Sequence, residues 1–189
     1  MRRCPVILFA CLLVLAPIAL SQQDDPAADY TKIREGMTKL SSLVGKWKAV
    51  ATYYNGEQVR TNEGTYDVDW ALDQTYLEFR VTLHSTVDPS RQHGFRLFMT
   101  YNPASHRYDC TYFYTRWALR VTATGEYDDA KKLLRYNTFI PLEDGVHDEA
   151  VHSTMDLSEP NKVTYTHYSR YSNQDNERMD VRIVLTREK

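Results

Sequence analysis

Leu43-Val-Gly-Lys-Trp47-Lys-Ala-Val-Ala-Thr-Tyr-Tyr54 is the stretch that decides the fold, because it separates a helical pattern from a long series of strand patterns. Before it, apolar residues recur with the period of a helix. From Trp47 onward they alternate with polar residues, which is the period of a half-buried strand. We therefore expect Trp47 to close the floor of a β-structure that begins here.

The segment before Leu43 has one apolar face. Ile33, Met37, Leu40 and Val44 are spaced by four, three and four residues, as on one side of a helix. Asp29 is a residue type that caps the start of a helix. We predict an N-terminal amphipathic helix that covers one end of the structure built by the strands.

Ten strand patterns follow, separated by turn residues such as Asn55-Gly56 and Asp144-Gly145. They cover residues 47–54, 58–71, 76–84, 94–101, 108–115, 119–127, 133–140, 147–157, 162–172 and 179–187. The connections are too short for the crossovers that parallel strands need, so the sheet must be antiparallel. Closure removes its exposed edges. The predicted fold is all-β, a single antiparallel up-and-down β-barrel of about ten strands.

Two hairpins specify their own register. A four-residue loop at 72–75 places Ala71 opposite Tyr76, and a loop at 102–107 places Tyr101 opposite Tyr108. In each hairpin one face is then strongly apolar, as a half-buried sheet requires. The apolar pairs are Trp70–Leu77, Val68–Phe79, Tyr66–Val81, Met99–Cys110, Leu97–Tyr112 and Phe95–Tyr114.

The chain resembles a bacterial lipocalin-like family of unknown function that belongs with the calycins. The resemblance rests on Leu43-Val44-Gly45-Lys46-Trp47, on Trp70-Ala71-Leu72 followed by Tyr76-Leu77-Glu78, and on the turn Tyr101-Asn102-Pro103-Ala104-Ser105-His106-Arg107-Tyr108. It extends from about Leu40 to the C-terminus. It implies a lipocalin-like barrel, an exported setting, and an arginine of the last strand, Arg182 or Arg187, beside Trp47. It implies no particular ligand or catalytic residue.

A barrel of this size has an interior that either is filled by side chains or holds one small ligand. The chain has 14 tyrosines, which combine a flat apolar ring with a hydrogen-bonding hydroxyl. Both interpretations, a packed core and a ligand cavity, stay open at this point. The candidates for lining the lumen are Tyr66, Val68, Trp70, Phe79, Val81, Leu97, Met99, Tyr112 and Tyr114.

His152 and His167 are the candidates for a metal or haem site. If residues 158–161 form a loop, Leu157 faces Lys162 and the two histidines face each other, with Cβ atoms about 5 Å apart. A zinc site needs further ligands, and the sequence offers no convincing third one. A haem needs only one axial histidine. The other interpretation is two surface histidines, and we expect no cofactor.

Residues 1–21 have the pattern of a signal peptide, with Arg2 and Arg3 before an apolar run and a small residue at Ala19 and Ser21. We divide the chain into 1–21 signal peptide, 22–42 lead-in and helix, and 43–189 barrel. Cleavage lowers the Lys plus Arg count from 23 to 21 against 25 Asp plus Glu residues. This acidic balance argues against a nucleic-acid partner. Export also predicts a periplasmic or secreted protein without a stable membrane span.

Three functions follow from these patterns. The favoured one is an exported barrel that binds a small apolar or amphipathic molecule. The second is a haem or metal protein, or an enzyme, that uses His152 and His167. The third is an interaction module with a filled barrel, whose exposed Tyr53, Trp117 and Tyr168 would form a patch.

The sequence has no nucleophile elbow, phosphate loop or zinc-protease motif, so we predict that it is not an enzyme. Cys110, in a strand pattern, is predicted to be a buried structural thiol.

Overall fold

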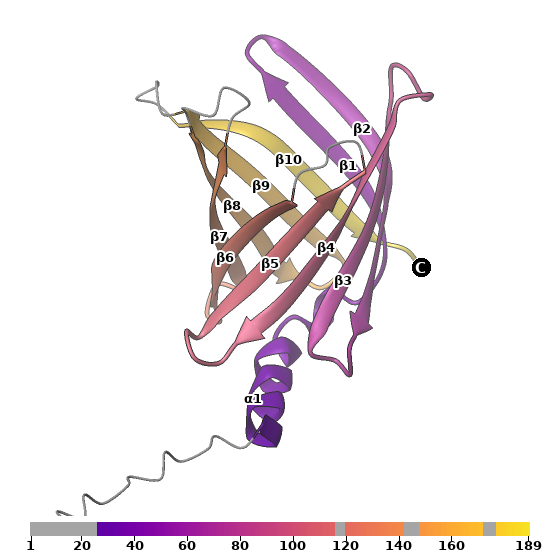
Figure 1. Ribbon diagram of the computed structural model, residues 1–189. Helices are drawn as coiled ribbons and strands as arrows, with labels where there is room; N and C mark the ends of the chain where they lie inside the picture. Colours follow the sequence, from indigo (N-terminus) through magenta and orange to yellow (C-terminus); the bar gives the residue numbers. More distant parts are fainter. Residues whose placement is uncertain (1–25, 116–119, 142–147, 172–176) are drawn as a thin grey trace, which may run out of the picture.

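The computed structural model describes residues 26–115, 120–141, 148–171 and 177–189 (Figure 1). A helix α1 (Pro26–Thr38) and a short 3₁₀ turn η1 (Ser41–Leu43) precede the strands. These are β1 (Gly45–Asn55), β2 (Gln58–Ala71), β3 (Tyr76–Ser85), β4 (Gln92–Asn102), β5 (Arg107–Tyr114), β6 (Arg120–Asp128), β7 (Leu133–Pro141), β8 (Asp148–Glu159), β9 (Lys162–Tyr171) and β10 (Arg178–Arg187). The predicted signal peptide and most of the lead-in lie outside the described residues.

The strands form one closed antiparallel barrel in which each pairs with its neighbours in the chain and β1 also pairs with β10. The predicted fold is therefore confirmed. The turns of the hairpins β2–β3, β4–β5, β6–β7 and β8–β9 lie at the end of the barrel that carries α1. The turn between β1 and β2 lies at the other end (Figure 1). In the described part of the chain, no helix is both long and apolar enough to cross a bilayer.

The two hairpin registers are also confirmed. Trp70 pairs with Leu77 and Val68 with Phe79 across β2 and β3, and Met99 pairs with Cys110 across β4 and β5. On the outer face of β2 and β3, Arg80 bridges Asp67 at 3.2 Å and Glu78 at 2.8 Å. The separation into an apolar inner face and a charged outer face fixes the register, since a slip of one residue would exchange the two.

The helix is shorter at its C-terminal end than its apolar spacing predicts. It ends at Thr38, and the Leu40 amide bonds instead to the Met37 carbonyl at 2.9 Å. Hydrogen bonds of this i to i+3 kind tighten the last turn and redirect the chain into β1. Met37, Leu40 and Leu43 are nevertheless fully buried, and the Tyr108 hydroxyl donates to the Gly36 carbonyl at 2.7 Å. The segment thus covers one end of the barrel as predicted.

Trp47 lies under this cover, at the start of β1, with 1% of its surface exposed. Its indole N–H donates to the Leu43 carbonyl at 2.8 Å. The guanidinium of Arg187 lies over the indole, with Cζ 4.1 Å from the ring centroid, and donates to the carbonyls of Val44 and Ser42. Of the two arginines that the resemblance implies, Arg187 is therefore the partner, whereas Arg182 is exposed.

The packed core occupies the half of the barrel next to α1. Many of its most buried large side chains come from strand ends at that side, and they include Trp47, Val68, Leu77, Met99, Tyr108 and Leu134. Toward the other end several large inward-facing side chains are less completely packed, since Tyr53, Phe95 and Tyr112 are only partly buried. The candidate site begins where this dense packing stops.

Candidate functional site

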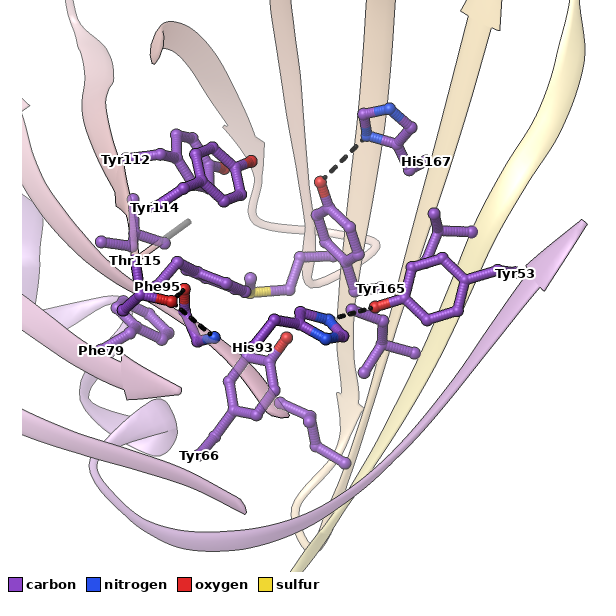
Figure 2. A pocket seen from close by; sticks show the side chains of 16 residues that line it. Tyr53, Tyr66, Phe79, His93, Phe95, Tyr112, Tyr114, Thr115, Tyr165 and His167 are labelled. Carbon is purple, nitrogen blue, oxygen red and sulfur yellow. Dashed lines mark hydrogen bonds between the residues drawn. The ribbon is translucent and has the colours of Figure 1, made fainter. Parts of the chain in front are cut away.

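A cavity of about 580 Å³ occupies the barrel lumen beyond the packed core and is partly open to solvent (Figure 2). Its wall is formed by inward-facing residues of β1 to β5 and β8 to β10, and most of that wall is apolar. Among the described residues, the side chains that line it include no Asp, Glu, Lys or Arg. This volume lies within the range of about 300–1,000 Å³ that is typical of small-molecule sites.

Five of the nine predicted lumen residues line the cavity, namely Tyr66, Phe79, Leu97, Tyr112 and Tyr114. Of the other four, Val68, Val81 and Met99 are buried in the core and Trp70 packs against it. Val68 and Met99 sit nearer α1, where Val68 pairs with Gly45 and Met99 with Leu77. Alternation in sequence identified the inward face correctly but not the depth along the barrel axis. Whether any of these residues binds a ligand stays a prediction.

The lumen also contains residues that the sequence analysis did not assign to it. They come chiefly from β1, β4 and the last three strands, and they include Tyr53, His93, Phe95, Thr115, Met155, Tyr165, Val181, Ile183 and Leu185. Phe95 was paired correctly with Tyr114 but not assigned to the cavity. Closure of the barrel is the signal that would have identified the lining residues of the first and last strands. The pairing of β10 with β1 brings the inward faces of both ends of the chain into one wall.

Aromatic rings form much of this wall. Phe95 packs edge-on against Tyr66, with centroids 6.0 Å apart, and lies 5.7 Å from Tyr114 and 6.2 Å from Tyr112. Burial raises the pKa of Tyr66 and of Tyr112 well above the usual value of 10.0. These phenols are therefore neutral at physiological pH, and each presents a flat apolar surface with a hydroxyl that can donate or accept a hydrogen bond.

A first polar pair in the lumen joins β1 to β4. The Tyr53 hydroxyl lies 3.1 Å from Nε2 of His93, and the two rings meet nearly edge-on (Figure 2). Desolvation by burial raises the pKa of Tyr53 to about 12, against a smaller lowering effect of the Asn62 side chain. Tyr53 lines the cavity and is only partly exposed, so it is not part of an exposed patch, and that element of the interaction-module prediction is wrong.

A second polar group joins β8 to β9. The Tyr165 hydroxyl donates to Ser153 Oγ at 2.9 Å, and Ser153 Oγ lies 3.1 Å from His167 Nδ1. The Tyr165 hydroxyl also lies 3.4 Å from the same nitrogen (Figure 2). Burial lowers the pKa of His167 from 6.5, with Asp180 opposing this effect and His152 adding to it. A neutral imidazole is therefore held in a hydrogen-bonded position on the cavity wall.

The predicted pairing of His152 with His167 is wrong. A register irregularity between Asp156 and Glu159 places His152 opposite Tyr168 and Ser153 opposite His167. Neighbouring residues of a strand point to opposite faces. His152 consequently lies on the outer surface, where its ring stacks on Tyr168 with the ring centroids 4.7 Å apart. Its Nδ1 lies 2.5 Å from Oε1 of Glu177. His167, in contrast, faces the lumen.

This separation rules out a metal site shared by the two histidines in this geometry. The described residues also form no group of three or more His, Cys, Asp or Glu side chains suited to a metal ion. A haem held through His167 alone stays a prediction, and so does the expectation of no cofactor. Visible absorption and metal content of the purified protein test both.

Two further predictions concern single side chains. Cys110 is buried and free, as predicted, and burial strongly raises the pKa of its thiol, which disfavours the reactive thiolate. Tyr168 stacks on His152 on the outer surface, and Trp117 lies outside the described residues. The described residues therefore do not form the predicted patch of Tyr53, Trp117 and Tyr168.

Comparisons with known proteins agree with this architecture. The family model described as a protein of unknown function (DUF1579) matches residues 35–187. The crystal structure of Rv2717c from M. tuberculosis is similar over 82% of this chain and 98% of its own, with a TM-score of 0.62 and 10% identity. The S-type phycobiliprotein lyase CPES from Guillardia theta covers 86% of this chain and 97% of its own, with a TM-score of 0.59 and 10% identity. No curated protein matches the sequence. At such low identity the structural likeness shows a shared fold and nothing more.

Proposed function

The chain belongs to the DUF1579 family of proteins of unknown function, and we propose that it is an exported carrier or receptor that binds one small apolar or amphipathic molecule in its lumen. The observation that carries this proposal is the cavity of about 580 Å³ bounded by aromatic and aliphatic side chains. A barrel whose role was only structural would gain stability by filling this space, because unfilled apolar volume in a core lowers stability.

The distribution of polar groups supports the same function. The Tyr53–His93 pair and the Tyr165–Ser153–His167 group lie on the wall of an otherwise apolar cavity. A few placed polar groups in an apolar pocket are typical of sites that orient a small ligand. The dense core next to α1, with Trp47 beneath it, gives that site a rigid base.

Export and the absence of catalysis are the remaining parts of the proposal. Export rests on the signal-peptide pattern of residues 1–21, and N-terminal sequencing of the protein recovered from a secreting host tests it, with cleavage after Ser21 as the expected result. The prediction that the protein is not an enzyme rests on the absence of a known catalytic motif from the sequence.

A blocked-lumen variant tests the binding function. Ile183 and Val184 are neighbours on β10, and Ile183 lines the cavity while Val184 does not. Ile183→Trp should fill much of the lumen and weaken binding of the uncharged fluorescent probe N-phenyl-1-naphthylamine at least tenfold. Val184→Trp adds the same side chain beside it and should leave the affinity within twofold of the parent.

Circular dichroism would establish that both variants keep the fold. The proposal fails if the parent protein does not bind this probe or any member of a panel of lipids and aromatic molecules. It also fails if Ile183→Trp binds the probe as tightly as Val184→Trp does, because the bound molecule would then lie outside the lumen.

A further inference from the structure

A small side pocket of about 50 Å³ adjoins the main cavity. The two spaces share Tyr112, Tyr114, Tyr165 and His167 in their walls, and Ser153 and Thr138 line only the smaller one. Val121, Ala123 and Val151 supply apolar parts of its wall, and a space of this size accommodates a water molecule or a small substituent of a ligand, but not a second ligand. The side pocket is therefore a recess of the main cavity, and the Tyr165–Ser153–His167 group supplies polar atoms to its wall.

The hydrogen bonds in this recess engage the imidazole of His167 at Nδ1. Because Tyr165 donates to Ser153 Oγ, the single hydroxyl proton of Ser153 is available for another acceptor. His167 Nδ1 lies 3.1 Å from Ser153 Oγ, and we assign this contact as donation from Ser153 to Nδ1. A neutral His167 then carries its proton on Nε2. Among the described residues Nε2 has no hydrogen-bond partner, so an N–H donor is available at the cavity wall.

The charges around His167 make the recess unsuitable for an anion. On β10, Asp180 is bonded to Ser169 and pairs with Arg178 at 2.8 Å. His152 faces outward from β8, and the neighbouring groups Tyr112, Tyr114 and Tyr165 are phenols whose pKa is raised by burial. With no Lys or Arg among the described lining residues, a buried carboxylate would lose its hydration without gaining a cation.

We infer that the ligand of this lumen is uncharged, with an apolar body in the main cavity and an acceptor oxygen, such as an ester or ketone carbonyl, that accepts a hydrogen bond from His167 Nε2. Ser153 and Tyr165 are positioning residues that hold the imidazole in this tautomer. The inference rests on the proposed binding function and adds the chemical class of the molecule and the end by which it is oriented.

Competition between two molecules of equal chain length tests the inference. At pH 7.5, methyl laurate should displace N-phenyl-1-naphthylamine from the parent protein at a concentration at least tenfold lower than laurate does. His167→Phe should lose this preference, so that the ratio of the displacement constants of laurate and its methyl ester, each corrected for the variant's own affinity for the probe, falls close to one. His152→Phe, which changes the outward-facing histidine, should behave like the parent.

The outcomes separate this inference from the function on which it rests. Laurate binding as tightly as its methyl ester, or an unchanged ester preference in His167→Phe, would overturn the inference and leave a lumen that binds the probe. No binding of the probe would remove the function itself.

A second measurement avoids substitution altogether. The ¹⁵N shifts of His167 in the parent protein should report a neutral ring protonated at Nε2 at pH 7.5, and the Nε2 signal should move when methyl laurate is added. A ring protonated at Nδ1, or a charged ring, would overturn the assignment.

Discussion

Replacing Arg187 by alanine should destabilise the barrel more than the loss of a surface arginine does. Arg187 is the last residue of β10, and its guanidinium covers the Trp47 ring at 4.1 Å. One N–H donates to the Val44 carbonyl at 2.9 Å, and another donates to the Ser42 carbonyl. This single side chain therefore joins the last strand, the first strand and the segment that leads from α1.

The magnitude follows from these contacts. A cation over an indole contributes about 0.5–2 kcal/mol, and a hydrogen bond from a charged donor contributes about 1.5–3 kcal/mol when buried. Because Arg187 is only partly buried, we take about 0.5 kcal/mol for the cation–π contact and slightly less than the lower limit for each of the two hydrogen bonds, and we expect a loss of about 3 kcal/mol in the free energy of unfolding. For a chain of this length that corresponds to a decrease of about 6–12 °C in Tm.

Urea and thermal unfolding followed by circular dichroism measure this loss, with Arg182→Ala as the matched control. Arg182 is an exposed arginine on the same strand, and its replacement should change the free energy of unfolding by less than about 0.5 kcal/mol. Arg187→Lys should fall between the two, because lysine keeps the charge but lacks the planar fork. A loss in Arg187→Ala no larger than in Arg182→Ala would refute the reasoning.

Three further changes have predictable directions. Gln74 has φ +65°, a left-handed backbone conformation that costs a residue with a Cβ about 1–2 kcal/mol. Gln74→Gly removes this steric cost, which exceeds the entropy cost of glycine, and should raise the free energy of unfolding measured in urea by up to about 1 kcal/mol. Gly36→Ala should lower it by about 1–3 kcal/mol, despite the better helix propensity of alanine, since the new Cβ would lie 2.2 Å from Tyr101 Cδ1. Because the pKa of His167 is lower in the folded protein than in the unfolded chain, the unfolded chain binds a proton at a higher pH than the folded protein does. The free energy of unfolding of the parent should therefore decrease as pH falls below about 6.5. The free energy of unfolding, measured by denaturation at pH 8 and at pH 5, should fall less between the two pH values in His167→Asn than in the parent. In His152→Asn it should fall as much as in the parent.

The sequence predicted the barrel because its strands alternate cleanly. Between Tyr66 and Val81 each inward position is apolar and most outward positions are charged, so only one register keeps both faces satisfied. The β8–β9 hairpin has no such constraint, because Ser153 and His167 are polar residues that face inward. The bulge near Asp156 then shifts the pairing by one residue, and alternation alone does not reveal an inserted residue.

Depth along the barrel was the other property that alternation could not supply. Tyr66 and Val68 belong to the same face of β2, yet Tyr66 lines the cavity and Val68 lies in the core. The level of each residue depends on strand tilt and stagger, which closure of the whole barrel determines. The contribution of Ile183 and Val181 to the lumen likewise depends on the pairing of β10 with β1.

Native mass spectrometry of the protein as purified tests the central claim most directly, because it weighs whatever the lumen retains. We predict one small molecule bound per chain in the parent and in Val184→Trp, and its absence from Ile183→Trp. The same bound mass in Ile183→Trp would contradict a ligand site in the lumen. So would a parent protein that carries no molecule and takes up none when the probe is added.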